Sequence, residues 1–76
     1  MKYQYKIIGL VGKMFAQKLF YKFETDYPYT FNVGDEVWFP ENWKKEQGGG
    51  TIWKVKEVQH YVVENFVAVY VFNEMA

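Results

Sequence analysis

A chain of 76 residues, half of them hydrophobic, has the length of one domain, residues 1–76. It contains no cysteine and no serine, which excludes disulfides, thiol catalysis, cysteine-based zinc sites and the common serine nucleophile triads. Its nine basic residues are all lysines and are balanced by nine acids, so the chain has neither the positive field nor the arginine forks that many nucleic-acid-binding proteins use.

The charge is nevertheless uneven along the chain. Residues 1–23 contain five lysines and no acid, whereas residues 24–50 contain six acids and two lysines. The apolar run at 7–11 is too short for the core of a signal peptide, and no run approaches the roughly 18 apolar residues of a spanning helix. We therefore expect a cytoplasmic protein with no membrane association.

The first element is predicted as a half-buried strand over residues 2–11. Tyr3, Tyr5 and Ile7 alternate with polar residues, and this alternation breaks before Gly9, as it does at a β-bulge. The Gly12-Lys13 pair then predicts a tight hairpin turn.

Residues 14–24 fit two structures. As a helix they place five apolar residues in one sector, whereas the aromatic density of 19–23 favours a pleated strand. Gly12 offers no side-chain acceptor for a helix N-cap, so we favour the strand. The fold class is then all-β. The alternative is α+β with one helix at 13–24.

Turn and breaker residues over 25–30 lead to a short strand that begins near Glu36 and stops at Pro40. A polar loop ends in Gly48-Gly49-Gly50, and a long strand over 51–62 changes face near Glu57-Val58. Glu64-Asn65 predicts a hairpin turn before residues 66–72, which are apolar on both faces and so indicate burial on both sides.

Two motifs carry a resemblance to known folds. They are Phe31-x-Val33-Gly34-Asp35-x-Val37 and Gly50-Thr51-Ile52-Trp53-Lys54-Val55-x-x-Val58. Over residues 31–72 the chain resembles SH3-like small β-barrels of the KOW and Tudor kind, and short phage and prophage accessory proteins with the same layout. The resemblance implies a five-stranded barrel or meander in which Gly34 makes the entry turn. It implies no particular function, because such barrels have many unrelated partners.

Aromatic and basic residues surround the polar loop and form the predicted partner-binding surface. One or two of the aromatics must belong to the core, and the others have the composition of a protein-binding patch or a base-stacking platform. The residues are Trp38, Phe39, Trp43, Lys44, Lys45, Trp53 and Lys54.

The remaining chemical candidates favour structural roles. His60 is the only histidine and has no companion ligands for a metal. Asp35 and Glu36 are adjacent and point to opposite faces of a strand, so they cannot act jointly on one bond. The glycine triplet lacks the Lys-Ser/Thr and the following helix of a phosphate loop. We therefore expect no enzyme activity, no metal and no cofactor.

The preferred hypothesis is a non-enzymatic protein-interaction module, such as a phage or mobile-element accessory or inhibitor protein that docks to a larger partner. The alternative is a nucleic-acid-binding small barrel that uses Lys2, Lys6, Lys18 and Lys22 with exposed aromatics. We also predict a homodimer with Phe66, Tyr70 and Phe72 at the contact, because one small barrel has a single interior and cannot cover both faces of strand 66–72.

Overall fold

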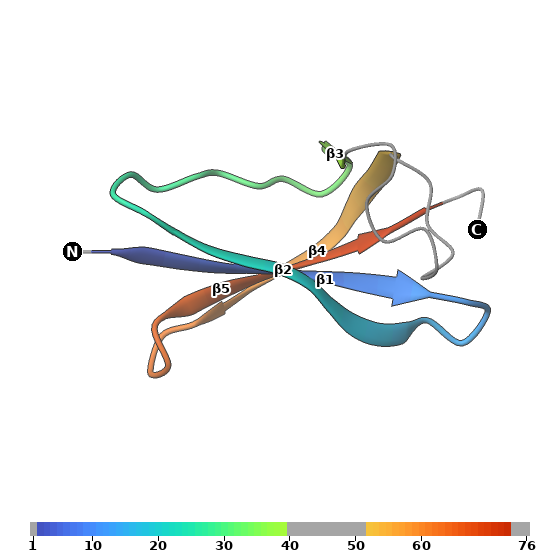
Figure 1. Ribbon diagram of the computed structural model, residues 1–76, viewed down its shortest axis with the longest axis horizontal. Coiled ribbons are helices and arrows are strands. Elements are labelled where there is room, and N and C mark those ends of the chain that lie inside the picture. Colours follow the sequence, from blue (N-terminus) through green and yellow to red (C-terminus); the bar gives the residue numbers. More distant parts are fainter. Residues whose placement is uncertain (1, 40–51, 74–76) are drawn as a thin grey trace.

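The computed structural model describes residues 2–39 and 52–73. These residues form one five-stranded sheet without a helix, and the sheet curls into a half-barrel (Figure 1). The strands are β1 (Tyr3–Val11), β2 (Ala16–Thr25), β3 (Glu36–Trp38), β4 (Ile52–Tyr61) and β5 (Phe66–Phe72). The all-β prediction is confirmed, and the segment that also fitted a helix is the ten-residue strand β2. In the described part of the chain no helix is long and apolar enough to cross a membrane.

The order of strands in the sheet is β2-β1-β5-β4-β3. Hairpins join β1 to β2 and β4 to β5, β3 pairs antiparallel with β4, and β1 runs parallel to β5. The sheet therefore does not follow chain order as a simple meander does. The parallel pair puts β5, the most apolar strand, at the centre of the sheet, and leaves β2 and β3 as the two edges.

Both hairpin turns are longer than the sequence predicts. The β1–β2 turn spans residues 12–15, with positive φ at Gly12 and Phe15, and the Phe15 N–H donates to the Gly12 carbonyl. The β4–β5 turn spans residues 62–65, where Asn65 has φ 60°. Asn tolerates this left-handed conformation better than most residues, which is why its presence marks the turn in the sequence.

The larger core lies on the inner face of the curled sheet. Its buried side chains come from four strands and are Ile7, Phe20, Trp53, Val55, Val69 and Val71. A smaller cluster lies on the outer face, where Leu10, Ala68 and Tyr70 are buried and Ile8, Tyr61, Phe66 and Phe72 are partly buried. The prediction that residues 66–72 are buried on both sides is thus confirmed for Ala68 through Val71.

Two bulges decide which side chains reach the inner face. In the β1–β2 pair, Ile7 lies opposite Tyr21 and Ile8 opposite Leu19, so Phe20 is the extra residue and turns inward beside Tyr21. In the β4–β5 pair the extra residue is Lys56, which shifts the inner positions from Val55 to Val58. The change of face predicted near residues 57–58 is this second bulge.

Candidate functional site

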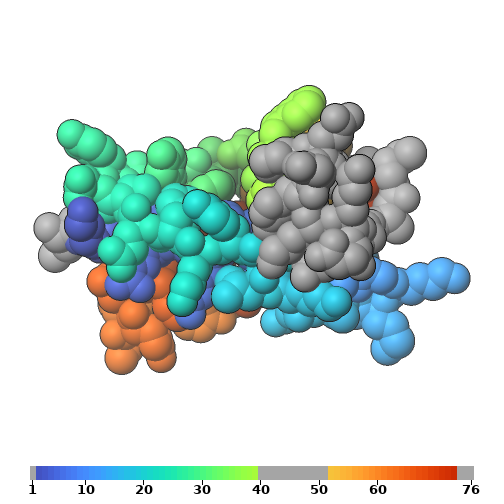
Figure 2. All heavy atoms as spheres, viewed as in Figure 1, coloured from blue at the N-terminus to red at the C-terminus, as the bar shows by residue number. Residues whose placement is uncertain are grey.

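An apolar groove lies on the inner side, where the two edge strands of the half-barrel face each other without pairing. Its volume is about 420 Å³. We call it the aromatic groove, and its lining residues are Ile7, Tyr21, Phe23, Phe31, Val37, Trp38 and Phe39. In the space-filling view the connector between β2 and β3 (green) lies along β2 (teal) (Figure 2).

One wall of the groove follows from the register of β1 and β2. Tyr5 pairs with Phe23 and Ile7 with Tyr21, so all four side chains are on the inner face. The Tyr5 and Phe23 rings stack with centroids 5.2 Å apart, and those of Tyr21 and Phe23 are 5.7 Å apart. Stacked rings of this kind hold one another in fixed positions.

The connector between β2 and β3 is fixed by the Tyr5 hydroxyl. This hydroxyl accepts a hydrogen bond from the Tyr29 N–H at 2.7 Å and donates to the Tyr29 carbonyl at 3.3 Å. The Tyr5 ring also contacts the rings of Tyr29 and Phe31, at 5.9 and 5.7 Å. A single strand residue therefore sets where Phe31 enters the groove.

The opposite wall begins at the turn predicted around Gly34-Asp35. Gly34 has φ 97°, a conformation that favours glycine, and the Asp35 carboxylate accepts the Asn32 N–H at 2.9 Å. Two backbone hydrogen bonds then join the turn to Val55 of β4. The Gly34 N–H donates to the Val55 carbonyl, and the Val55 N–H donates to the Asp35 carbonyl. This brings Val37 and Trp38 to the groove.

The lining of the groove is almost entirely apolar. Among the described lining residues the only polar side-chain groups are the Tyr21 hydroxyl and the Trp38 indole N–H. Both side chains are exposed, Tyr21 to 54% and Trp38 to 65%. Such a site can bury aliphatic or aromatic groups and offer them a hydrogen bond at the rim. Its described lining residues include no carboxylate, lysine or histidine.

The residues of the predicted partner-binding surface are distributed over several environments. Trp38 and Phe39 line the aromatic groove. Trp53 is 1% exposed, so its ring is a core element and is not available to a partner. Lys54 is partly buried, and it pairs with Phe72 in the register of β4 and β5. Trp43, Lys44 and Lys45 lie outside the described residues.

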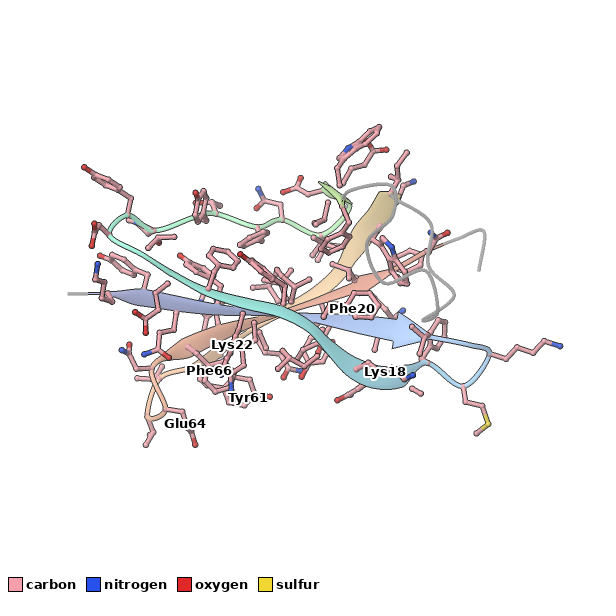
Figure 3. All side chains as sticks on the ribbon, in the orientation of Figure 1. Lys18, Phe20, Lys22, Tyr61, Glu64 and Phe66 are labelled. Carbon is pink, nitrogen blue, oxygen red and sulfur yellow. The ribbon has the colours of Figure 1, made fainter. Side chains whose placement is uncertain are left out.

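The three residues predicted at a dimer contact share the outer face. Phe66 and Phe72 are partly buried, and Tyr70 is buried, with 9% of its surface exposed. The Phe66 ring stacks on Tyr61 with centroids 4.5 Å apart, and the Lys6 ammonium lies 4.0 Å from the Phe66 centroid. The labelled side chains of Lys22, Tyr61 and Phe66 lie together in Figure 3.

A small polar network occupies the β4 side of this face. The Gln59 carbonyl oxygen accepts the Tyr61 hydroxyl at 2.6 Å and the Tyr70 hydroxyl at 3.3 Å, while its amide donates to Glu57. Hydrogen bonding with Tyr61 is the largest influence that raises the pKa of Tyr70 to about 12, and burial and the charges of Tyr61 and Glu57 add to it.

The four lysines of the nucleic-acid hypothesis do not lie on one surface. Lys2 forms an ion pair with Asp26 at 2.6 Å. Lys6 and Lys22 are directly opposite each other on the outer face, whereas Lys18 pairs with Gly9 on the inner face. The sheet therefore brings together two of the four.

Within residues 2–39 and 52–73, no three His, Asp or Glu side chains are close enough to hold a metal ion. His60 is exposed on β4 and pairs with Val67 in the register.

Five groove residues are not predicted as site residues from the sequence: Ile7, Tyr21, Phe23, Phe31 and Val37. The available signal for Phe31 is the alternation of Tyr27, Tyr29 and Phe31 in a segment rich in turn residues. Three aromatic side chains are unusual in a connector exposed to solvent, so the alternation indicates packing against the sheet. That signal does not say which strands the rings meet.

Comparison of the chain with protein-family models, curated proteins and solved structures finds no match. The groove and the two sheet faces are therefore the basis for any assignment of function.

Proposed function

We propose that this chain is a non-enzymatic protein-interaction module that holds an extended apolar segment of a larger partner in the aromatic groove. The observation that carries the proposal is the groove, whose apolar lining includes the exposed Tyr21 and Trp38. Large exposed aromatics beside a concave apolar surface are typical of the residues that dominate protein interfaces.

Kinship with SH3-like small barrels is part of this proposal. It is supported by the curled five-stranded sheet and by the role of the Gly34-Asp35 turn, which attaches β3 to β4 through backbone hydrogen bonds. Small barrels of this kind accommodate many partners through their loops and open edges, which agrees with an accessory protein that acts by docking.

The test is selection of random peptides on the immobilised full chain. Peptides enriched on the wild type should contain apolar or aromatic residues, and Trp38→Ala should raise their Kd roughly thirtyfold, corresponding to the ~2 kcal/mol of an interface hot spot. Tyr27→Ala is the matched control, because Tyr27 is 80% exposed and is not a lining residue. Peptides that bind Trp38→Ala as well as the wild type would contradict the groove as the site.

One observation favours a second candidate, a nucleic-acid-binding small barrel. Lys6 and Lys22 are cross-strand neighbours with like charges, an arrangement that an anionic ligand would relieve. Binding of single-stranded DNA or RNA through these lysines should fall steeply as salt rises, whereas docking of an apolar peptide should respond little. Salt-dependent binding that is abolished by Lys22→Gln would support this candidate.

A further inference from the structure

The edge of the sheet that β2 forms is open along its second half. β2 pairs with β1 on one side, and in the described part of the chain no strand pairs with its other side. Beyond the bulge at Phe20, the stretch from Tyr21 to Thr25 follows β1 residue for residue, and it contains no proline. A regular edge of this kind presents backbone N–H and C=O groups to any strand that lies alongside it.

Two exposed charges of opposite sign lie on this stretch. Lys22 and Glu24 are on the outer face, and the partly buried Phe23 between them is on the inner face. Lys22 lies directly opposite Lys6 of β1, where like charges repel each other, and Glu24 lies opposite Gln4. Within residues 2–39 and 52–73, neither Lys22 nor Glu24 belongs to an ion pair.

The order Lys22-Phe23-Glu24 is complementary to itself in an antiparallel pair. A two-fold axis perpendicular to the sheet at Phe23 places Lys22 of each copy opposite Glu24 of the other. An axis at Lys22 would set lysine against lysine, and an axis at Glu24 would set glutamate against glutamate. An axis between two residues would place an outer side chain opposite an inner one. Charge therefore selects one register for this stretch.

We propose that β2 binds β2 of a second copy of this chain along residues 21–25, with the two-fold axis at Phe23, so that the two sheets become one. Glu24 of the other copy then lies beside Lys22, on the side away from Lys6, and it neutralises the repulsion between these two lysines. The two Phe23 rings meet at the axis on the inner face, where Phe23 is only partly buried in the single copy.

A second copy fits this edge better than a nucleic acid does. A phosphate backbone attracted to Lys22 would meet Glu24 two positions along the same edge, and it has no peptide groups to pair with those of β2. A strand of another protein can pair with the same backbone. The second copy is preferred because its own sequence supplies the acid opposite Lys22 and the base opposite Glu24.

The proposed contact is distinct from the other two surfaces of the molecule. It lies at an edge, whereas the dimer predicted at Phe66, Tyr70 and Phe72 would use the outer face. β2 does contribute Tyr21 and Phe23 to the aromatic groove, but the contact is made by the β2 backbone and by charges on the outer face. The proposal therefore does not rest on peptide binding in the groove.

Charge reversal tests the dimer and its register together. Analytical ultracentrifugation of the full chain over a range of concentrations should show a dimer for the wild type. K22E alone and E24K alone should each raise the dimer Kd roughly tenfold, because each places two like-charge pairs across the axis. An equimolar mixture of the two variants should restore the dimer, since both contacts of the heterodimer join opposite charges. K18E is the matched control, because Lys18 lies on the same strand before the bulge, and it should dimerise as the wild type does.

Amide hydrogen exchange locates the contact on the edge. Alternate amides of residues 21–25 should become protected as the concentration rises, whereas those of the other edge, β3, should not change. Leu19→Gln should dimerise as the wild type does, because Leu19 is on the outer face and outside residues 21–25. A wild type that is monomeric at high micromolar concentration overturns the proposal, and so does protection of these amides by a peptide alone. A dimer that Leu19→Gln weakens, or that mixing K22E with E24K fails to restore, also contradicts it.

Discussion

Gly9 shows how one residue without a side chain can determine the packing of this sheet. A Cβ at this position would lie 2.1 Å from Cζ of Phe20, so the aromatic ring rests directly on the β1 backbone. From there Phe20 meets Trp53 edge-on, with centroids 4.9 Å apart, and links β2 to β4 across the interior. The bulge that turns Phe20 inward and the glycine that makes room for it therefore act together.

Gly9→Ala should destabilise the fold by about 1–3 kcal/mol, because the Phe20 ring must shift within a packed core. Urea denaturation measures the loss. A double-mutant cycle with Phe20→Leu compares the cost of Gly9→Ala with and without the aromatic ring. Without the ring the new methyl group should have no close clash, so the cost should be smaller. A cost of Gly9→Ala that is the same in both backgrounds would show that the clash with Phe20 is not its cause.

Tyr70 should make the stability of the fold depend on pH in the alkaline range. Its pKa is raised from the ordinary tyrosine value of 10.0 to about 12 in the folded chain, so folding favours the protonated hydroxyl. The stability that this contributes is fully present below pH 10 and is lost as the pH rises toward 12. Titration followed by phenolate absorbance should show one tyrosine ionising late. Tyr61→Phe should move that pKa back toward 10, because hydrogen bonding with Tyr61 is its largest cause. A late titration unchanged in Tyr61→Phe would contradict this origin.

At the level of elements, the sequence predicts what depends on local pattern. Alternation in residues 2–7 indicates the faces of β1, and the loss of alternation near Glu57-Val58 marks the bulge in β4. The bulge predicted before Gly9 is present in the β1–β2 pair, but its extra residue is Phe20 on β2 and not a residue of β1. The aromatic density of residues 19–23 identifies β2 as a strand, and the apolar run at 66–72 predicts burial on both faces.

Pairing between distant strands is not encoded in these patterns. Nothing in the periodicity of residues 3–11 and 66–72 says that they run side by side in parallel, because any two apolar strands satisfy the same local rules. The aromatic groove depends on that arrangement, since it draws Ile7, Phe31 and Trp38 from three separate segments. Trp38 and Phe39 can be predicted from the sequence because they are adjacent to each other and to the polar loop. Trp53 has the same composition signal, and only the fold shows that it is buried.

The connector between β2 and β3 should depend on one hydroxyl. Tyr5→Phe removes the hydroxyl that donates to the Tyr29 carbonyl and accepts from the Tyr29 N–H. We expect the free energy of unfolding to fall by about 1–2 kcal/mol. Amide hydrogen exchange at Tyr29 should accelerate. Tyr27→Phe is the control, because Tyr27 is largely exposed and its hydroxyl should matter little. Unchanged protection of the Tyr29 amide in Tyr5→Phe would show that ring packing alone holds the connector.

For the whole molecule, one sheet presents two chemically different faces. The inner face combines the larger core with the aromatic groove, while the outer face combines the smaller apolar cluster with lysines and acids on both sides of β5. A chain this small buries a modest fraction of its surface by itself. Using one face for a partner and the other for a second copy would extend that burial on both sides.

The dimer predicted from the sequence uses Phe66, Tyr70 and Phe72 of the outer face, whereas the groove lies on the inner side, so peptide binding and dimerisation should be separable. Leu19→Gln on the outer face should weaken such a dimer but bind groove-selected peptides with the wild-type Kd, and Trp38→Ala should lose the peptides but sediment as the wild type does. Fluorescence titration is suited to the first measurement, because Trp38 is exposed beside the groove while Trp53 is buried and changes little. Ultracentrifugation provides the second. If either variant lost both properties while remaining folded by circular dichroism, the two faces would be coupled through the sheet, and the assignment of separate functions to them would be wrong.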